Sequence, residues 1–114
     1  MNPAYKPLQA WKGNDFVQAF RFKAGPAKAR MDLTGSTVLM FVTWPGGEIS
    51  REMTLSSSAG DAVLDQASVS LTREEVRGFP LGRATRFEIE RRIGDDQETL
   101  LYGELVVAEW ANKD

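Results

Sequence analysis

The side chains of this chain that could do chemistry are carboxylates, because the sequence contains no histidine and no cysteine. Without these residues there is no Ser–His–Asp or Cys–His nucleophile and no zinc site of the usual ligands. Asp and Glu remain, and their oxygens suit hard cations such as Ca²⁺ and Mg²⁺ or acid–base catalysis. The spacing of the acidic residues therefore decides which chemistry is open.

The densest acidic cluster is Asp95, Asp96 and Glu98, which directly follows Gly94. A calcium loop of the EF-hand type places oxygens at alternate positions over a longer segment, and nothing in the sequence matches that pattern. A glycine followed by two aspartates is typical of a turn. We interpret the cluster as a solvated hairpin turn, with divalent-cation binding as the alternative.

Two pairs of carboxylates could in principle flank a glycosidic bond, namely Glu88 with Glu90 and Glu74 with Glu75. Neither pair is accompanied by a group of sugar-binding residues. Arginines alternate with Glu88 and Glu90, which is typical of an exposed sheet face with cross-strand charge pairs. The sequence contains neither of the phosphate-binding glycine motifs G-x-x-x-x-G-K and G-x-G-x-x-G. The sequence therefore predicts no enzyme, no cofactor and no metal.

The elements that would position any site are short strands separated by turns. The expected strands span residues 8–11, 16–22, 37–44, 49–55, 68–71, 83–92 and 99–107, with a further short apolar run at 63–64. Thr72 and Glu75 form a capping box, which predicts one short helical turn near 73–77. Turn signals at this density predict an all-β, antiparallel, immunoglobulin-like β-sandwich of about seven or eight strands.

The length of 114 residues predicts a single domain, 1–114, with a core over about 8–107 and tails at both ends. The strand over 37–44 is apolar on both faces, with Trp44 on one face and Leu39 and Phe41 on the other. A strand of this kind is covered on both sides. One cover is the core, and the other is a partner, a helix or the chain's own termini.

These features indicate contacts with other proteins. The tails, 1–7 and 107–114, carry aromatic residues and could add a strand to a neighbour's sheet, although simple fraying is the alternative. Trp44 could lie in the core, at a protein interface or on a sugar-stacking platform. The candidate interface residues are Tyr5, Trp11, Leu39, Phe41, Trp44, Tyr102 and Trp110.

Charge and hydropathy exclude other partners. The net charge is −2, and Arg91–Arg92 is the one basic pair, so we expect no nucleic-acid binding. No apolar stretch approaches the roughly 20 residues that span a bilayer, so we expect no membrane insertion. The absence of cysteine, and a start without the apolar segment of a signal peptide, predict synthesis in a cytoplasm.

Several segments, in their order along the chain, resemble a family of small β-sandwich proteins of tailed bacteriophages and prophages. These segments are Lys12-Gly13-Asn14-Asp15-Phe16, Asp32-Leu33-Thr34-Gly35-Ser36-Thr37-Val38, Ser70–Val76, Phe79–Arg83, Phe87-Glu88-Ile89 and Leu100–Val107. They are similar to the N-terminal domain of siphophage upper baseplate proteins, and the resemblance covers about residues 12–107. The D-L-T-G-x-T-V turn is its most specific part.

The resemblance implies a non-enzymatic structural or assembly component of a phage tail tip, baseplate or neck. It implies a location in the virion after synthesis in the host cytoplasm. The expected partners are other phage structural proteins, copies of the chain itself, or both, in a homo-oligomeric assembly. Two alternatives fit the same composition: a small soluble adaptor or inhibitor of a host protein, and a carbohydrate-binding module that uses Trp44.

Overall fold

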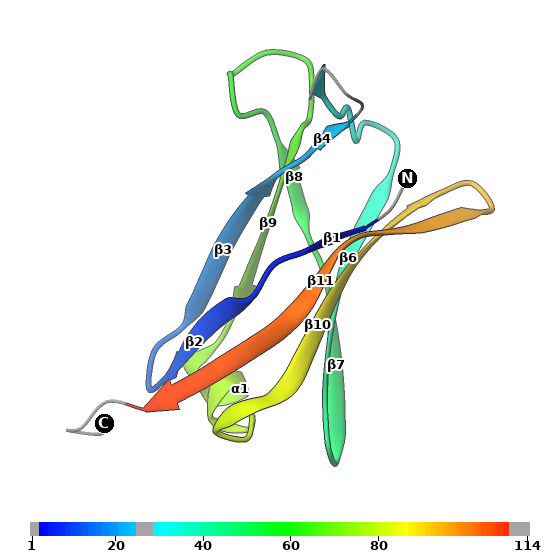
Figure 1. The fold of residues 1–114 in the computed structure, drawn as a ribbon. Coiled ribbons are helices and arrows are strands. Elements are labelled where there is room, and N and C mark those ends of the chain that lie inside the picture. The colour runs from blue at the N-terminus through cyan, green and yellow to red at the C-terminus, as the bar shows by residue number, and fades with distance from the viewer. Residues whose placement is uncertain (1–2, 25–28, 110–114) are drawn as a thin grey trace.

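The computed structural model describes residues 3–24 and 29–109, which fold into two facing β-sheets (Figure 1). The large sheet has the strand order β1–β11–β10–β6–β7, with β2 also along β11, and the small sheet has the order β3–β9–β8. The strands of the large sheet are β1 (Ala4–Tyr5), β2 (Leu8–Lys12), β6 (Thr37–Trp44), β7 (Gly47–Glu52), β10 (Gly82–Ile93) and β11 (Asp96–Glu109). Those of the small sheet are β3 (Phe16–Arg21), β8 (Thr54–Ser56) and β9 (Gln66–Leu71).

This order confirms the predicted all-β, immunoglobulin-like sandwich. An immunoglobulin domain pairs its B, E and D strands in one sheet and its G, F and C strands in the other. Here β3, β9 and β8 correspond to B, E and D, and β11, β10 and β6 correspond to G, F and C. Two very short strands, β4 (Lys23–Ala24) and β5 (Ala29–Arg30), pair with each other beside the sandwich.

The core fills the space between the sheets, because alternate side chains of a strand point to opposite faces and the inward-facing ones are mostly apolar. The even-numbered residues 38–42 of β6 and the odd-numbered residues 87 and 89 of β10 are buried. The predicted helical turn is α1 (Arg73–Arg77), and Thr72 and Glu75 make the predicted capping box. Val76 of α1 is fully buried, so the turn closes one end of the core.

The strand predicted over 49–55 is two strands. β7 ends at Glu52 in the large sheet, and β8 begins at Thr54 in the small sheet. Met53 lies at the crossing, where it is buried and its N–H donates to the carbonyl of Val38 over 2.8 Å. The predicted inward direction of Met53 and Leu55 holds on both sides of this crossing, because Met53 is in the core and Leu55 packs against it. The short apolar run at 63–64 forms no strand.

The N-terminal segment is part of the chain's own sheet rather than a tail over its described length. Ala4 and Tyr5 pair in parallel with Leu101 and Tyr102 of β11, and β2 continues the same register. The sandwich is therefore antiparallel except along this edge. A Cβ on Gly103 would lie 2.2 Å from the carbonyl oxygen of Lys6, so the close crossing of β11 by the N-terminal segment requires glycine there.

A buried ion pair anchors the 57–65 loop at one end of the sandwich. Asp65 is 2% exposed, and the guanidinium of Arg30 donates to both of its carboxylate oxygens, at 2.9 and 3.1 Å. Ser58 donates two further hydrogen bonds to the same carboxylate. Asp61 and Ser57 also bind Arg30. We call Arg30, Ser57, Ser58, Asp61 and Asp65 the Arg30 cluster.

Candidate interaction surface

The outer face of the large sheet carries a row of side chains set by strand register. Ser50 of β7 pairs with Phe41 of β6, Phe41 pairs with Glu88 of β10, and Glu88 pairs with Tyr102 of β11. Tyr5 of β1 extends the row beyond Tyr102. We call these five residues the aromatic row. It places three aromatic rings beside Ser50 and Glu88 across five strands, and aromatic residues are enriched at protein interfaces.

The two tyrosines form one end of the row. Their rings lie 5.4 Å apart at 69°, an edge-to-face arrangement that aromatic pairs favour. Tyr5 is 53% and Tyr102 is 43% exposed. The Tyr5 hydroxyl donates to the carboxylate of Glu104 over 3.1 Å, and this hydrogen bond raises the pKa of Tyr5. The pair is therefore ordered and still open to a partner.

Phe41 lies in the middle of the row and is half-buried. The guanidinium of Arg92 stands 5.7 Å from the centre of its ring, within the range of a cation–π contact. Glu90 orients Arg92 through a hydrogen bond of 2.7 Å. A shallow hollow of about 190 Å³ separates Phe41 from Tyr102. The surface thus offers both apolar rings and paired charges. The Arg92–Glu90 pair lies within β10, whereas the alternating Arg and Glu residues predicted pairs across strands.

The structure brings together four of the seven candidate residues: Tyr5, Leu39, Phe41 and Tyr102 share the outer face of the large sheet. Trp44 lies at the end of β6 on the inner face, where its ring packs 4.9 Å from that of Phe79. Trp44 therefore closes the core and does not join the aromatic row.

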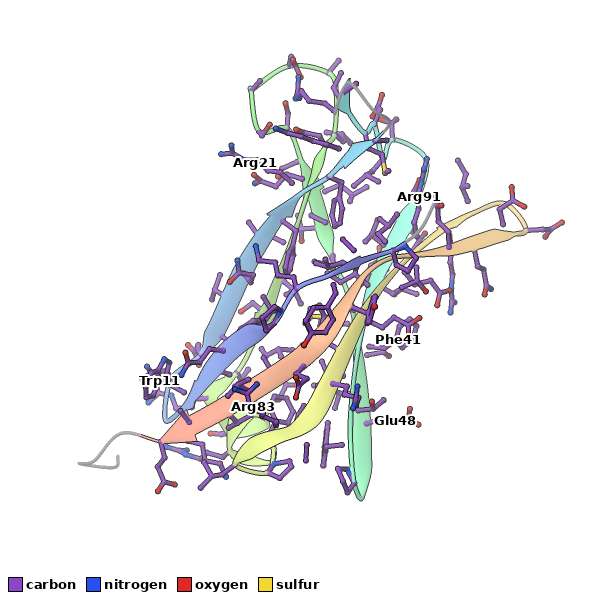
Figure 2. All side chains as sticks on the ribbon, viewed as in Figure 1. Trp11, Arg21, Phe41, Glu48, Arg83 and Arg91 are labelled. Carbon is purple, nitrogen blue, oxygen red and sulfur yellow. The ribbon has the colours of Figure 1, made fainter. Side chains whose placement is uncertain are left out.

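Gly47 also contacts Trp44, because a Cβ built there would come within 2.6 Å of the indole ring. The two remaining tryptophans fall elsewhere. Trp11 is half-buried at the end of β2 and lies far from Phe41 (Figure 2). Trp110 lies outside the described residues.

The predicted acidic turn forms the exposed tip of the β10–β11 hairpin. β10 and β11 project past the rest of the large sheet and end in Gly94-Asp95 (Figure 1). Glu98 pairs with Arg91 across the hairpin at 3.5 Å. In residues 3–24 and 29–109, no group of three acidic side chains is placed to hold a metal ion.

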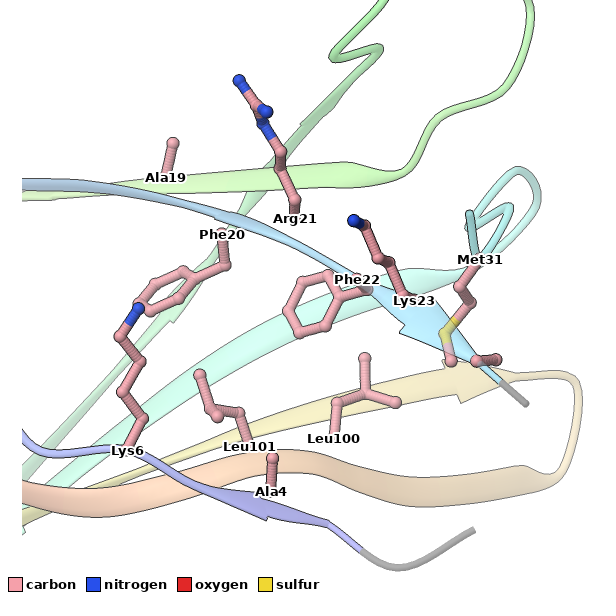
Figure 3. Close-up of a pocket in the computed structure, with 11 residues that line it drawn as sticks. Ala4, Lys6, Ala19, Phe20, Arg21, Phe22, Lys23, Met31, Leu100 and Leu101 are labelled. Atoms are coloured by element: carbon pink, nitrogen blue, oxygen red, sulfur yellow. The ribbon is translucent and has the colours of Figure 1, made fainter. Parts of the chain in front are cut away.

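Sequence reasoning missed a groove between the two sheets. Its volume is about 550 Å³, and Phe20, Phe22, Met31, Leu100 and Leu101 form its apolar lining (Figure 3). No acidic residue contributes to it, whereas three cations do. The signal in the sequence was the run of alternating aromatic and basic residues from Phe20 to Lys23, which reads as an ordinary two-faced strand.

A scan against protein-family models finds no match to this chain, and a search of curated proteins finds no similar sequence. Within the described residues, no helix has the length and hydrophobicity to cross a membrane.

Proposed function

We propose that this protein is a non-enzymatic structural or assembly component of a phage tail tip, baseplate or neck, and that it acts through protein–protein contacts. The observation that carries the protein-binding part is the aromatic row, with exposed Tyr5 and Tyr102 beside half-buried Phe41. Tyrosines and arginines are the side chains most enriched where interfaces gain their binding energy. The phage part is supported by the resemblance over residues 12–107.

The row suits a protein partner better than a sugar. A sugar platform presents flat aromatic faces, but the rings of Tyr5 and Tyr102 are edge to face at 69°. The indole of Trp44 packs against Phe79 and Gly47. Extended β-sheet faces with aromatic and paired charged residues match the flat, mixed surfaces of protein assemblies.

The test is mass spectrometry of density-banded phage particles induced from the strain that encodes the chain. We expect the protein in the particles at a fixed ratio to tail proteins. If it is abundant in the lysate and absent from the particles, it is not a virion component, and pull-downs of host proteins would then test the adaptor alternative.

A pair of variants tests the surface itself. Tyr102→Glu places a charge in the aromatic row and should remove the protein from particles. Val17→Glu is the matched control, because Val17 is 70% exposed on the small sheet. Equal incorporation of both variants would contradict the role of the row.

A further inference from the structure

The groove between the sheets lies along two strand edges that have no partner among the described residues. β3 pairs only with β9, and β1 and β2 pair only with β11. An immunoglobulin sheet of the ABED type has a further strand beside B. Here β3 takes the B place, and the first strands of the chain follow β11 instead. The side of the sandwich between β3 and β1 is therefore open.

The open side combines an apolar interior with a basic rim (Figure 3). Phe20 of β3 and Phe22, which directly follows β3, point toward Leu100 and Leu101 of β11. Lys6 rises from the opposite edge toward Phe20.

Arg21 and Lys23 alternate with these aromatic residues and point outward, away from Leu100 and Leu101, so their charges lie on the outer side of the groove's edge. Within the described part of the chain, Lys6, Arg21 and Lys23 make no ion pair. The three side chains give this side of the molecule a local positive charge, although the chain's net charge is −2. A local positive charge favours an acidic occupant.

The same chain carries a matching element. The β10–β11 hairpin projects from the sandwich, and its tip holds Asp95 and Asp96, both exposed and without an ion pair among the described residues. Ile93, beside them, is 42% exposed and supplies an apolar side chain. In the described structure, no strand covers residues 96–99 on the side away from β10, since the pairing with β1 begins at Leu101.

The two elements are close enough to act together in one contact. Asp96 precedes Leu101 in β11 by five residues, which is about 15 Å along a strand. A two-fold axis beside this end of the molecule would place each hairpin against the groove of the other copy. Two-fold dimers are the commonest oligomers, and such a contact closes on itself.

We infer that the occupant of the groove is the β10–β11 hairpin of a second copy of this chain, with Ile93 entering the apolar interior and Asp95 and Asp96 meeting the basic rim. This inference deepens the proposed structural role. It rests on that role in one respect, namely that the partner is a protein. Purified protein tests self-association and phage particles test the virion role, so the two can fail separately.

The experiment is sedimentation velocity on the purified chain over a range of concentrations in low salt. We expect a concentration-dependent species with twice the mass of one chain, and salt should weaken it because exposed charges are screened. A single-chain mass at every concentration up to about 1 mM, where even weak specific contacts form, would overturn the inference.

Charge reversal identifies the surfaces. The groove variant Arg21→Glu/Lys23→Glu and the tip variant Asp95→Lys/Asp96→Lys should each weaken self-association by roughly tenfold or more, because each places like charges opposite one another. Arg73→Glu/Arg86→Glu is the control for the groove variant, since it makes the same change in net charge on exposed residues that do not line the groove. Equal weakening by the control would overturn the assignment.

A mixture of the groove and tip variants provides the decisive readout. The acidic groove of one variant then faces the basic tip of the other, so the mixture should form a mixed dimer that neither variant forms alone. Thermal melting of each variant first shows that it is folded. Folded variants that remain monomeric when mixed would contradict the pairing of hairpin and groove.

Discussion

The Arg30 cluster and the aromatic row use charged side chains in opposite ways. In the cluster, the carboxylate of Asp65 is 2% exposed and accepts hydrogen bonds from Arg30 and Ser58 on both oxygens. In the row, Glu88 is exposed and accepts one hydrogen bond, from Thr99, at 2.7 Å. A buried charge is tolerated only when it is fully paired, whereas an exposed charge loses little by being unpaired.

Under the proposed function, this difference separates residues that stabilise the fold from residues that contact a partner. The cluster ties the 57–65 loop to Arg30 of β5 through hydrogen bonds to Ser57, Asp61 and Asp65. The row leaves Tyr5 and Tyr102 partly in water, so burial by another protein would still gain free energy. Substitutions in the cluster should therefore lower the stability of the fold, and substitutions in the row should weaken binding to a partner.

The largest effect is expected from Asp65→Ala. It leaves the guanidinium of Arg30 without its buried partner and removes two hydrogen bonds from Ser58. Arg30 is about a third exposed and keeps Asp61, whereas the two Ser58 donors lose a buried acceptor, so the melting temperature should fall by roughly 10 °C or more. Differential scanning calorimetry measures it, with Asp96→Ala as the exposed control. If Asp65→Ala and Asp96→Ala melt at the same temperature, the buried cluster contributes no more to stability than an exposed carboxylate does.

Acid should weaken the same cluster. Hydrogen bonds from Arg30 hold the pKa of Asp61 and Asp65 well below the usual value of 3.8. A lowered native pKa stabilises the fold above the unfolded pKa, and this contribution disappears as the pH falls through the native value. The gap in melting temperature between the native protein and Asp65→Asn should thus narrow from neutral pH to about pH 2. A constant gap would contradict the pairing.

The sequence predicted local features better than the places where the chain changes sheets. The capping box at Thr72 and the two-faced strand of residues 37–44 depend on neighbouring residues, and both are confirmed. The prediction of one strand over 49–55 was wrong because Met53 fits the inward alternation whether or not the chain crosses between sheets. Alternation fixes which way a side chain points, not which sheet its strand joins.

The same limit applies to the interaction surface. Leu39 and Phe41 belong to one strand, so their shared face could be predicted from period-two alternation. Their approach to Tyr102 depends on the register of β10 between β6 and β11, which no local pattern encodes. The groove joins Lys6, Phe20 and Leu101 across the two sheets and was equally out of reach.

A smaller effect is expected from Gly103→Ala, which asks whether the aromatic row depends on the N-terminal strand. The new methyl group would collide with the backbone of Lys6, and backbone cannot rotate away as a side chain can. Overpacking of this kind costs about 1–3 kcal/mol. Hydrogen exchange should show faster exchange at Tyr5 and Lys6. Gly60→Ala, which strains the positive-φ backbone of the 57–65 loop, controls for a general loss of stability. Unchanged protection would mean that the strand can shift as a unit.

A gain in stability is expected from Thr85→Val. The hydroxyl of Thr85 is fully buried and has no hydrogen-bond partner in the described structure, in contrast to the saturated Asp65. Replacing it with a methyl group of similar shape should stabilise the fold by about 1 kcal/mol. Urea unfolding measures the change, and Thr85→Ser, which keeps the hydroxyl, is the control. A loss of stability in Thr85→Val would indicate that the hydroxyl has a partner after all.

The smallest effect on stability is expected from Tyr102→Ser, and it tests the comparison most directly. Tyr102 is 43% exposed and contacts Tyr5 only through an edge-to-face ring pair, so the free energy of unfolding should change by about 0.5 kcal/mol or less. If unfolding in urea shows a loss close to that of Asp65→Ala, the row is part of the folding core. A small loss means that Tyr102 contributes little to folding, as the proposed interaction surface requires.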